Sequence, residues 1–163
     1  AFERGNYRFT VVQDSLQRRL DGITHPGWVD AMVTLIETKH CPKSCGCDRG
    51  YFRWDDSGDI QSIEHLARIC EIARRTPDVM HWLPTREYKM VEDYEGAIPS
   101  NLTIRLSAHM VDGQPPSGYG LPTSTVVSNA SDKTCPAKEQ GNKCLRCRDC
   151  WNPKVTNVAY PRH

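Results

Sequence analysis

The chain has 163 residues, a length that suits one domain able to bury its own apolar core. Its 21 basic and 20 acidic residues nearly cancel, so net charge gives no argument for binding nucleic acid or an anionic membrane. No apolar run approaches the ~20 residues of a membrane helix, and the polar stretch Ala1–Arg8 does not resemble a secretory signal, so we expect no membrane partner.

The N-terminal part of the chain predicts two helices. Residues 12–21 have the composition of a short polar helix with few core positions. Pro26 suits the start of a second helix over 27–39, in which Trp28, Met32 and Ile36 recur at helical spacing. The segment HCPKSCGCDRG follows as a loop.

Strands and helices alternate over the next part of the chain. One helix should begin after a capping Asp59 and stop before Pro77, and another should cover 86–94. The predicted strands are 51–54, 79–83, 102–106 and 123–128. This order is typical of a parallel sheet with crossover helices, and four strands are too few for a closed barrel. We therefore expect an α/β fold with an open, partial-barrel parallel sheet.

Polar residues follow several of these strands. In a parallel sheet the strand ends meet at one edge, so residues 55–59, 81–86 and 107–109 should share one side. Residues 129–163 are irregular, polar and cysteine-rich, so we expect bound metal rather than an apolar core to order them. The prediction is one α/β domain over 1–163, with 129–163 as its metal-cluster-binding tail.

The chain has eight cysteines, grouped rather than spread out. Four of them, Cys135, Cys144, Cys147 and Cys150, have the spacing C-x8-C-x2-C-x2-C. A C-x2-C-x2-C run wraps one segment around a cube-shaped cluster, and a distant cysteine supplies the fourth thiolate. The spacing therefore predicts a [4Fe-4S] cluster on these four residues, in a reducing cytosol. An even set of disulfides is the alternative that the cysteine count leaves open.

Zinc is the other metal that four cysteines can hold. Structural zinc sites usually present two separated C-x2-C pairs, so three cysteines in consecutive steps of three favour the cluster. Lys143, Arg146 and Arg148 either offset the charge of the thiolates or are solvated. Trp151 either shields the centre from water or takes part in local packing.

The remaining cysteines divide into two groups. Cys41, Cys45 and Cys47 form C-x3-C-x-C, one residue short of the C-x3-C-x2-C loop of enzymes that use S-adenosylmethionine for radical chemistry. They are candidates for a second metal site, and free thiols in a loop are the alternative. Cys70 falls on the apolar face of a predicted helix, where a buried structural role is expected.

Charged residues and histidines near the strand ends are weaker candidates. Arg53, Asp55, Asp56 and Asp59 could form a cation or general-base site, but the intervening Ser57-Gly58 favours a turn and helix cap. His81 and His109 lie near predicted strand ends and are more often structural than ligating. Arg86 and Arg105 could pair with the acidic loop or with an anionic ligand above the sheet.

Several segments together carry a family resemblance: FRWDDSGDIQSIEHL, HWLPTREY, IPSNLTIRLSA and CPA…KCLRCRDCW, with a terminal histidine. In this order, over residues 7 to 163, the chain resembles the phage gene product 88 domain family. The resemblance implies a bacteriophage origin and a location in the host bacterial cytoplasm. The chain is also similar, more remotely, to partial-barrel iron–sulfur enzymes of radical chemistry. Relatives usually carry a further cysteine-containing segment upstream of Ala1, and the CPKSCGC loop is not a family feature.

Three function classes are compatible with these observations. The first is electron transfer through one exposed cluster, with a redox partner that the sequence does not identify. The second is a cluster-dependent enzyme of radical S-adenosylmethionine-like architecture, holding a small-molecule substrate near residues 55–59. The third is a zinc-ordered interaction module, with Lys138 and Lys154 adding to the basic bias of the tail. Four cysteine ligands would leave no open iron for S-adenosylmethionine, so we favour the first class and do not expect nucleic acid as a partner.

Overall fold

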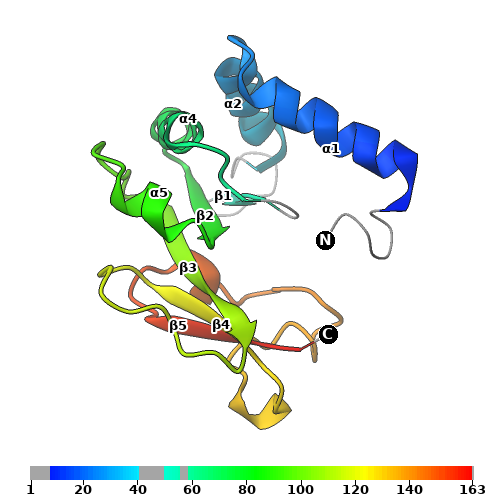
Figure 1. Ribbon diagram of the computed structural model, residues 1–163, viewed down its shortest axis with the longest axis vertical. Helices are drawn as coiled ribbons and strands as arrows, with labels where there is room; N and C mark the ends of the chain where they lie inside the picture. Colours follow the sequence, from blue (N-terminus) through cyan, green and yellow to red (C-terminus); the bar gives the residue numbers. More distant parts are fainter. Residues whose placement is uncertain (1–7, 41–49, 56–58, 163) are drawn as a thin grey trace.

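The computed structural model describes residues 8–40, 50–55 and 59–162. Its strands form one five-stranded sheet in which every neighbouring pair is parallel and the spatial order follows the chain, β1-β2-β3-β4-β5. The fold is α/β with a partial-barrel parallel sheet, as predicted (Figure 1). The elements are α1 (Thr10–Ile23), α2 (Trp28–His40), β1 (Gly50–Arg53), α4 (Ile63–Arg75), β2 (Val79–Thr85), α5 (Tyr88–Glu92), β3 (Leu102–Val111), β4 (Thr123–Val127), η2 (Ala130–Asp132), η3 (Asp149–Trp151) and β5 (Asn157–Pro161).

The helices differ from the predictions mainly at their ends. The predicted helix 12–21 is α1, which has no buried residue, and the predicted helix 86–94 is the shorter α5. Asp59 does not cap α4. Ser62 does, because its hydroxyl accepts the backbone N–H of His65 at 3.1 Å. The apolar face of α4, with Leu66, Ile69, Cys70, Ile72 and Ala73, is fully buried, and Ile63 at its start is exposed.

The fifth strand was not predicted. Residues 157–161 pair with β4 from Thr123↔Asn157 to Val127↔Pro161. The crossover into β5 runs through irregular chain and two short 3-10 helices, η2 and η3. The C-terminal part of the chain therefore belongs to the sheet and is more than an appended tail.

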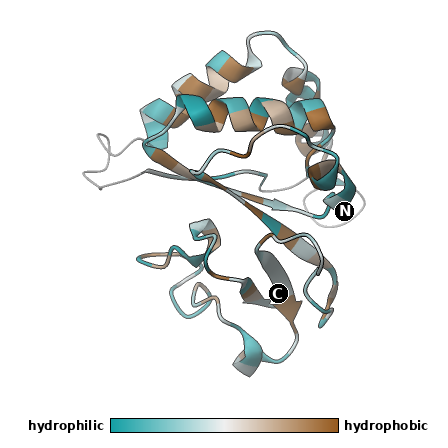
Figure 2. Ribbon diagram, turned by 90° about the vertical axis from the view of Figure 1, so that its left-hand side faces the viewer, coloured by the Kyte–Doolittle hydropathy of each residue, from teal (hydrophilic) through white to brown (hydrophobic). Residues whose placement is uncertain are grey.

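The sheet is covered on both faces, which matches the nearly continuous burial of β2 and β3. Alternate side chains of a strand point to opposite faces. One face packs with the helices. Figure 2 shows hydrophobic (brown) residues on both the helices and the strands. Its buried residues form the main core: Val29, Val33, Ile36, Trp54, Ile60, Leu66, Ile69, Cys70, Ile72, Ala73, Val79, Leu83, Leu102, Ile104 and Leu106.

A second apolar group, the C-terminal cluster, involves the chain beyond residue 130. Its buried members are Trp82, Cys150, Trp151 and Val158, and its half-buried members are Tyr51, Met80, Cys135, Val155 and Tyr160. The expectation that residues 129–163 lack a core is therefore wrong. Their apolar residues are too widely spaced to form a local pattern, but they pack against side chains of β1 and β2.

A glycine at the start of β1 permits a close approach of two backbones. A Cβ at Gly50 would lie 1.7 Å from the carbonyl oxygen of His40, so only glycine fits beside the last residue of α2. No helix in the described ranges has the length and apolar content needed to cross a membrane.

Candidate metal centre

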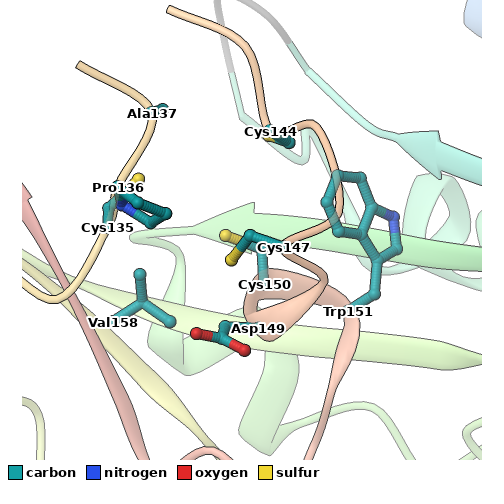
Figure 3. A pocket seen from close by; sticks show the side chains of 9 residues that line it. All are labelled: Cys135, Pro136, Ala137, Cys144, Cys147, Asp149, Cys150, Trp151 and Val158. Carbon is teal, nitrogen blue, oxygen red and sulfur yellow. The ribbon is translucent and has the colours of Figure 1, made fainter. Parts of the chain in front are cut away.

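The four cysteines with C-x8-C-x2-C-x2-C spacing line one small pocket (Figure 3). The sulfurs of Cys147 and Cys150 point toward the side on which Cys135 lies. The other lining residues are Pro136, Ala137, Asp149, Trp151 and Val158. All four cysteines are free thiols, as is Cys70, so no disulfide joins the cysteines that the structure describes.

The pocket is narrow as the side chains stand. Its cavity volume is about 10 Å³, close to the space that one water molecule requires. Within residues 8–40, 50–55 and 59–162, no group of three or more His, Cys, Asp or Glu residues is placed so as to hold a single metal ion. The four thiols thus surround a common space without converging on one point.

Cys135 is held in place by β5. The backbone N–H groups of Thr134 and Cys135 both donate to the carbonyl oxygen of Ala159, each at 3.0 Å. In return, the Thr134 hydroxyl accepts the N–H of Ala159 at 2.9 Å. The sheet therefore positions this cysteine, although the sequence around it has no strand pattern.

Cys144 and Cys147 belong to one tight turn. The N–H of Cys147 donates to the carbonyl of Cys144 at 2.8 Å, and Leu145 between them has a φ of 43°. The guanidinium of Arg148 donates to the carbonyls of Leu145 and Cys147 at 2.6 and 2.7 Å. Its charge also lies over the ring of Tyr51, 4.4 Å from the centroid, which joins the turn to β1.

Cys150 is the most buried of the four, in the 3-10 helix η3. Its sulfur lies 3.0 Å from the hydroxyl oxygen of Tyr160 in β5. Burial raises the pKa of the Cys150 thiol to about 11, while the Tyr160 hydrogen bond and the Arg105 cation act in the opposite direction. Burial also raises the pKa of Tyr160 well above its ordinary value. Metal binding at Cys150 would therefore release a proton near neutral pH.

Arg105 fixes the backbone that carries Cys150. This fully buried side chain of β3 donates to five carbonyls, none of which belongs to Asp55 or Asp59, the described residues of the acidic loop. Of the two partners considered for Arg105, pairing with these two carboxylates is therefore not observed. Four of the acceptors belong to the cysteine segment and the fifth to β4: Asp149 at 3.0 Å, Cys150 at 3.5 Å, Asn152 at 3.1 Å, Val155 at 3.1 Å and Thr123 at 2.7 Å.

Trp151 performs a structural role beside the centre. Its indole N–H donates to the carbonyl of Phe52 at 2.9 Å, and its own carbonyl accepts from the Thr103 hydroxyl at 2.8 Å. The ring also lines the pocket. Local packing and shielding, which the sequence left as alternatives, are thus both compatible with its position.

The second cysteine group lies outside the described residues. This applies to Cys41, Cys45 and Cys47, and also to Asp56 of the acidic loop and to the terminal His163. Cys70 is fully buried in the main core, as expected.

At the acidic edge of the sheet, Asp59 is hydrogen-bonded to neighbouring protein groups. Asp59 accepts from the Thr85 hydroxyl, from the N–H of Arg86 at 2.8 Å and from the N–H of Ile60 at 2.9 Å. Its oxygens are therefore engaged by the protein itself. The turn predicted at Ser57-Gly58 lies outside the described residues, and the predicted cap is wrong for Asp59, because Ser62 caps α4. Asp55 has a φ of 48°, and burial, together with the charge of Asp59, raises the pKa of Asp55 to about 6.

The two candidate histidines have different surroundings. His81 lies inside β2 and is fully buried, not at a strand end as predicted. His109 is near the end of β3, is exposed, and packs against Tyr88 with ring centroids 4.9 Å apart. The predicted shared edge holds for Asp59, Thr85 and Arg86, because Asp59 accepts hydrogen bonds from both of the others, and it does not hold for His81.

Sequence reasoning missed Tyr160 and did not predict the carbonyl acceptors of Arg105. Tyr160 comes ten residues after the last cysteine, in a strand with no clear alternation. Arg105 is the one Lys, Arg, Asp or Glu residue of β3, and a lone charge in a buried strand was the available signal that it contacts buried polar groups.

The comparisons with known proteins give one match. A family model described as gene product 88 matches residues 1–155, which is nearly the whole chain. No curated protein and no solved structure matches it.

Proposed function

This chain belongs to the gene product 88 family, and we propose that it is a bacteriophage-encoded [4Fe-4S] protein of the host bacterial cytoplasm that transfers electrons. The observation that carries the proposal is the meeting of Cys135, Cys144, Cys147 and Cys150 at one pocket, as free thiols, with a spacing typical of cluster ligands. Thiolates are the ligands that soft iron prefers.

The spacing of the thiols favours a cluster over a zinc ion, because three cysteines in consecutive steps of three are typical of cluster ligands. As the side chains stand, no described group of three or more His, Cys, Asp or Glu residues is placed to hold a single ion, and the pocket is too narrow for a cluster. Binding of either would require Cys144 and its turn to move outward. Residues 136–148 contain turns and no helix or strand, so such a movement requires little free energy.

Unequal exposure of the four ligands supports electron transfer. Cys150 and Trp151 are buried, whereas Cys144, Lys143 and Arg146 are exposed. When bound, the cluster would accept and return one electron. The protein would then exclude water on the β5 side and leave the side of Cys144 open to a redox partner. The exposed basic residues would favour an acidic surface on that partner.

The partial-barrel sheet is the one observation that favours the second candidate, a cluster-dependent enzyme. Two features weigh against it. Four cysteines leave no open iron for S-adenosylmethionine, and the oxygens of Asp59 are already hydrogen-bonded within the protein. A titration of the reduced protein with S-adenosylmethionine, followed by electron paramagnetic resonance, distinguishes the two. An unchanged spectrum supports electron transfer.

The decisive experiment is chemical analysis of the anaerobically purified chain. We expect iron and acid-labile sulfide in near-equal amounts, and a broad visible absorption that dithionite bleaches. Zinc without sulfide, or no metal at all after anaerobic reconstitution, would overturn the proposal.

A further inference from the structure

Arg105 makes no ion pair within 4.0 Å among the described residues, although the more distant charge of the Asp149 carboxylate acts on it. Ion pairs within 4.0 Å join other residues, namely Arg75 with Asp30 and Glu71, Lys89 with Asp93, and Lys133 with Glu139. Arg105 is fully buried, and the acceptors of its hydrogen bonds are neutral carbonyls. A buried cation without an anion in contact is costly. An anionic group placed close to it would reduce that cost.

Among the four candidate ligands, Cys150 is the one whose backbone carbonyl accepts a hydrogen bond from Arg105. The Arg105 Nε donates to the carbonyl of Cys150 at 3.5 Å, and its Nη2 to the carbonyl of the preceding Asp149 at 3.0 Å. The thiol of Cys150 lines the pocket shared by the four cysteines. Four thiolates around an iron–sulfur core give a centre with net negative charge, so Arg105 lies where that charge would be compensated.

Tyr160 supplies a hydrogen bond to the same cysteine. Its hydroxyl oxygen lies 3.0 Å from the Cys150 sulfur. A metal-bound thiolate has no proton, so in the loaded protein the hydroxyl of Tyr160 is the donor and the sulfur the acceptor. Tyr160 is itself held by packing, because its ring stacks on Trp82 at a centroid separation of 6.4 Å and an interplanar angle of 23°. The donor is therefore oriented before any metal binds.

We propose that Arg105 and Tyr160 are positioning residues that set the reduction potential of the metal centre by stabilising negative charge on the Cys150 sulfur. This rests on the proposed function, because it requires a redox-active group on the four cysteines. The reduced state carries one more negative charge than the oxidised state, so a buried cation and a hydrogen-bond donor stabilise it more. Both residues should therefore raise the potential.

Tyr160→Phe tests the hydrogen bond with the least disturbance, because it keeps the ring and removes only the hydroxyl. The measurement is a potentiometric titration of the anaerobic, cluster-loaded protein, read by electron paramagnetic resonance, with iron and sulfide content as a second readout. We expect wild-type iron content and a lower potential. At fixed ambient potential the ratio of reduced to oxidised protein should fall by up to about tenfold, which corresponds to about 59 mV for a one-electron couple.

Tyr51→Phe is the matched control. Tyr51 belongs to the same C-terminal cluster, but its ring packs on Trp151 at 5.6 Å and beneath Arg148. It should leave the potential unchanged. For the charge of Arg105, Arg105→Lys and Arg105→Met both lose the planar guanidinium, and only lysine keeps the charge. The lysine variant should have the higher potential of the two.

The outcomes separate the two proposals. A wild-type protein without iron and sulfide overturns the proposed function and this inference with it. An iron-loaded wild type whose potential equals that of Tyr160→Phe, or an equal shift in Tyr51→Phe, overturns this inference and leaves the proposed function standing. If both Arg105 variants fail to fold, the comparison of Tyr160→Phe with Tyr51→Phe still tests this inference.

Discussion

The indole N–H of Trp151 donates a hydrogen bond to the backbone carbonyl of Phe52, 2.9 Å away and 99 residues earlier in the chain. The contact links the last candidate ligand, Cys150, to the first strand of the sheet. It acts together with the C-terminal cluster and the five carbonyl bonds of Arg105. The segment that carries Cys150 is therefore fixed by protein contacts, so its position does not depend on a bound metal.

Trp151→Phe should lower the free energy of unfolding by about 1–3 kcal/mol, because it removes the bond to Phe52 and some buried ring area. Urea denaturation measures the loss. Trp28→Phe is the control, since Trp28 packs on Trp54 and His65 at the other side of the sheet. Hydrogen exchange should show faster exchange near residues 149–151 in the Trp151 variant alone. Identical exchange maps for the two variants would contradict the anchoring role.

Removal of the metal should affect the candidate ligands unequally. In chelator-treated protein we expect residues 149–161 to stay protected from hydrogen exchange, because Arg105 and the C-terminal cluster hold them. Residues 136–147 have fewer contacts with the sheet and should lose most of their protection. Uniform loss of protection from 134 to 161 would show that the metal, and not the sheet, orders the whole segment.

The contrast between these two segments explains what the sequence could predict. Helices α2 and α4 could be predicted because apolar residues such as Ile36 and Cys70, both fully buried, recur at the spacing of one helical face. Ligand spacing is local as well, so Cys144, Cys147 and Cys150 could be grouped without a structure. The partial-barrel sheet followed from the alternation of strands and helices.

Long-range contacts account for what could not be predicted. Tyr160 meets Cys150 only because β5 adds to the sheet beside β4, and β5 contains an asparagine and a proline that weaken its strand pattern. Arg105 finds its acceptors 44 to 50 residues away, apart from Thr123. Neither the Tyr160–Cys150 contact nor the Arg105 hydrogen bonds produce a periodic pattern in the sequence.

Cys147→Ser should lower the iron content of the anaerobically purified protein by more than half, because a serine oxygen is a poor ligand for soft iron. Cys70→Ser is the matched control. Cys70 is fully buried in the main core, so this variant should keep its iron and lose about 1–2 kcal/mol of stability. Iron and sulfide analysis measures the first effect and urea denaturation the second. Equal iron loading in the two variants would contradict the ligand assignment.

Asp59→Ala tests whether the acidic edge is structural. The carboxylate accepts from the Thr85 hydroxyl and from the N–H groups of Ile60 and Arg86. Its removal leaves these donors without their acceptor, so we expect a loss of about 2–3 kcal/mol in the free energy of unfolding. Iron content and reduction potential should not change, because the residue contacts no cysteine of the pocket. A stable Asp59→Ala protein with an altered cluster spectrum would point instead to a substrate site near residues 55–59.

His81 should make the protein less stable in mild acid. Its Nε2 lies 2.8 Å from the Thr76 hydroxyl, whose own proton goes to the carbonyl of Ile72. The ring therefore carries its proton on Nε2, and Nδ1 accepts the indole N–H of Trp54 at 3.2 Å. Burial, with a smaller effect of His40, lowers the pKa of His81 from 6.5 to about 4.

The sign follows from the direction of this shift. Between pH 6.5 and about 4 the unfolded chain binds a proton that folded His81 excludes, so stability falls as the pH falls through this window. His65, whose pKa burial also lowers to about 4, acts in the same direction. Asp55 acts in the opposite direction, because the pKa of its carboxyl is raised when folded.

His81→Gln isolates one group from the others, since glutamine does not titrate. Between pH 7 and 4.5 the free energy of unfolding of the wild type, measured by urea denaturation, should fall by about 2–3 kcal/mol more than that of His81→Gln. A difference that stays constant over this range would mean that folded His81 titrates like an exposed histidine.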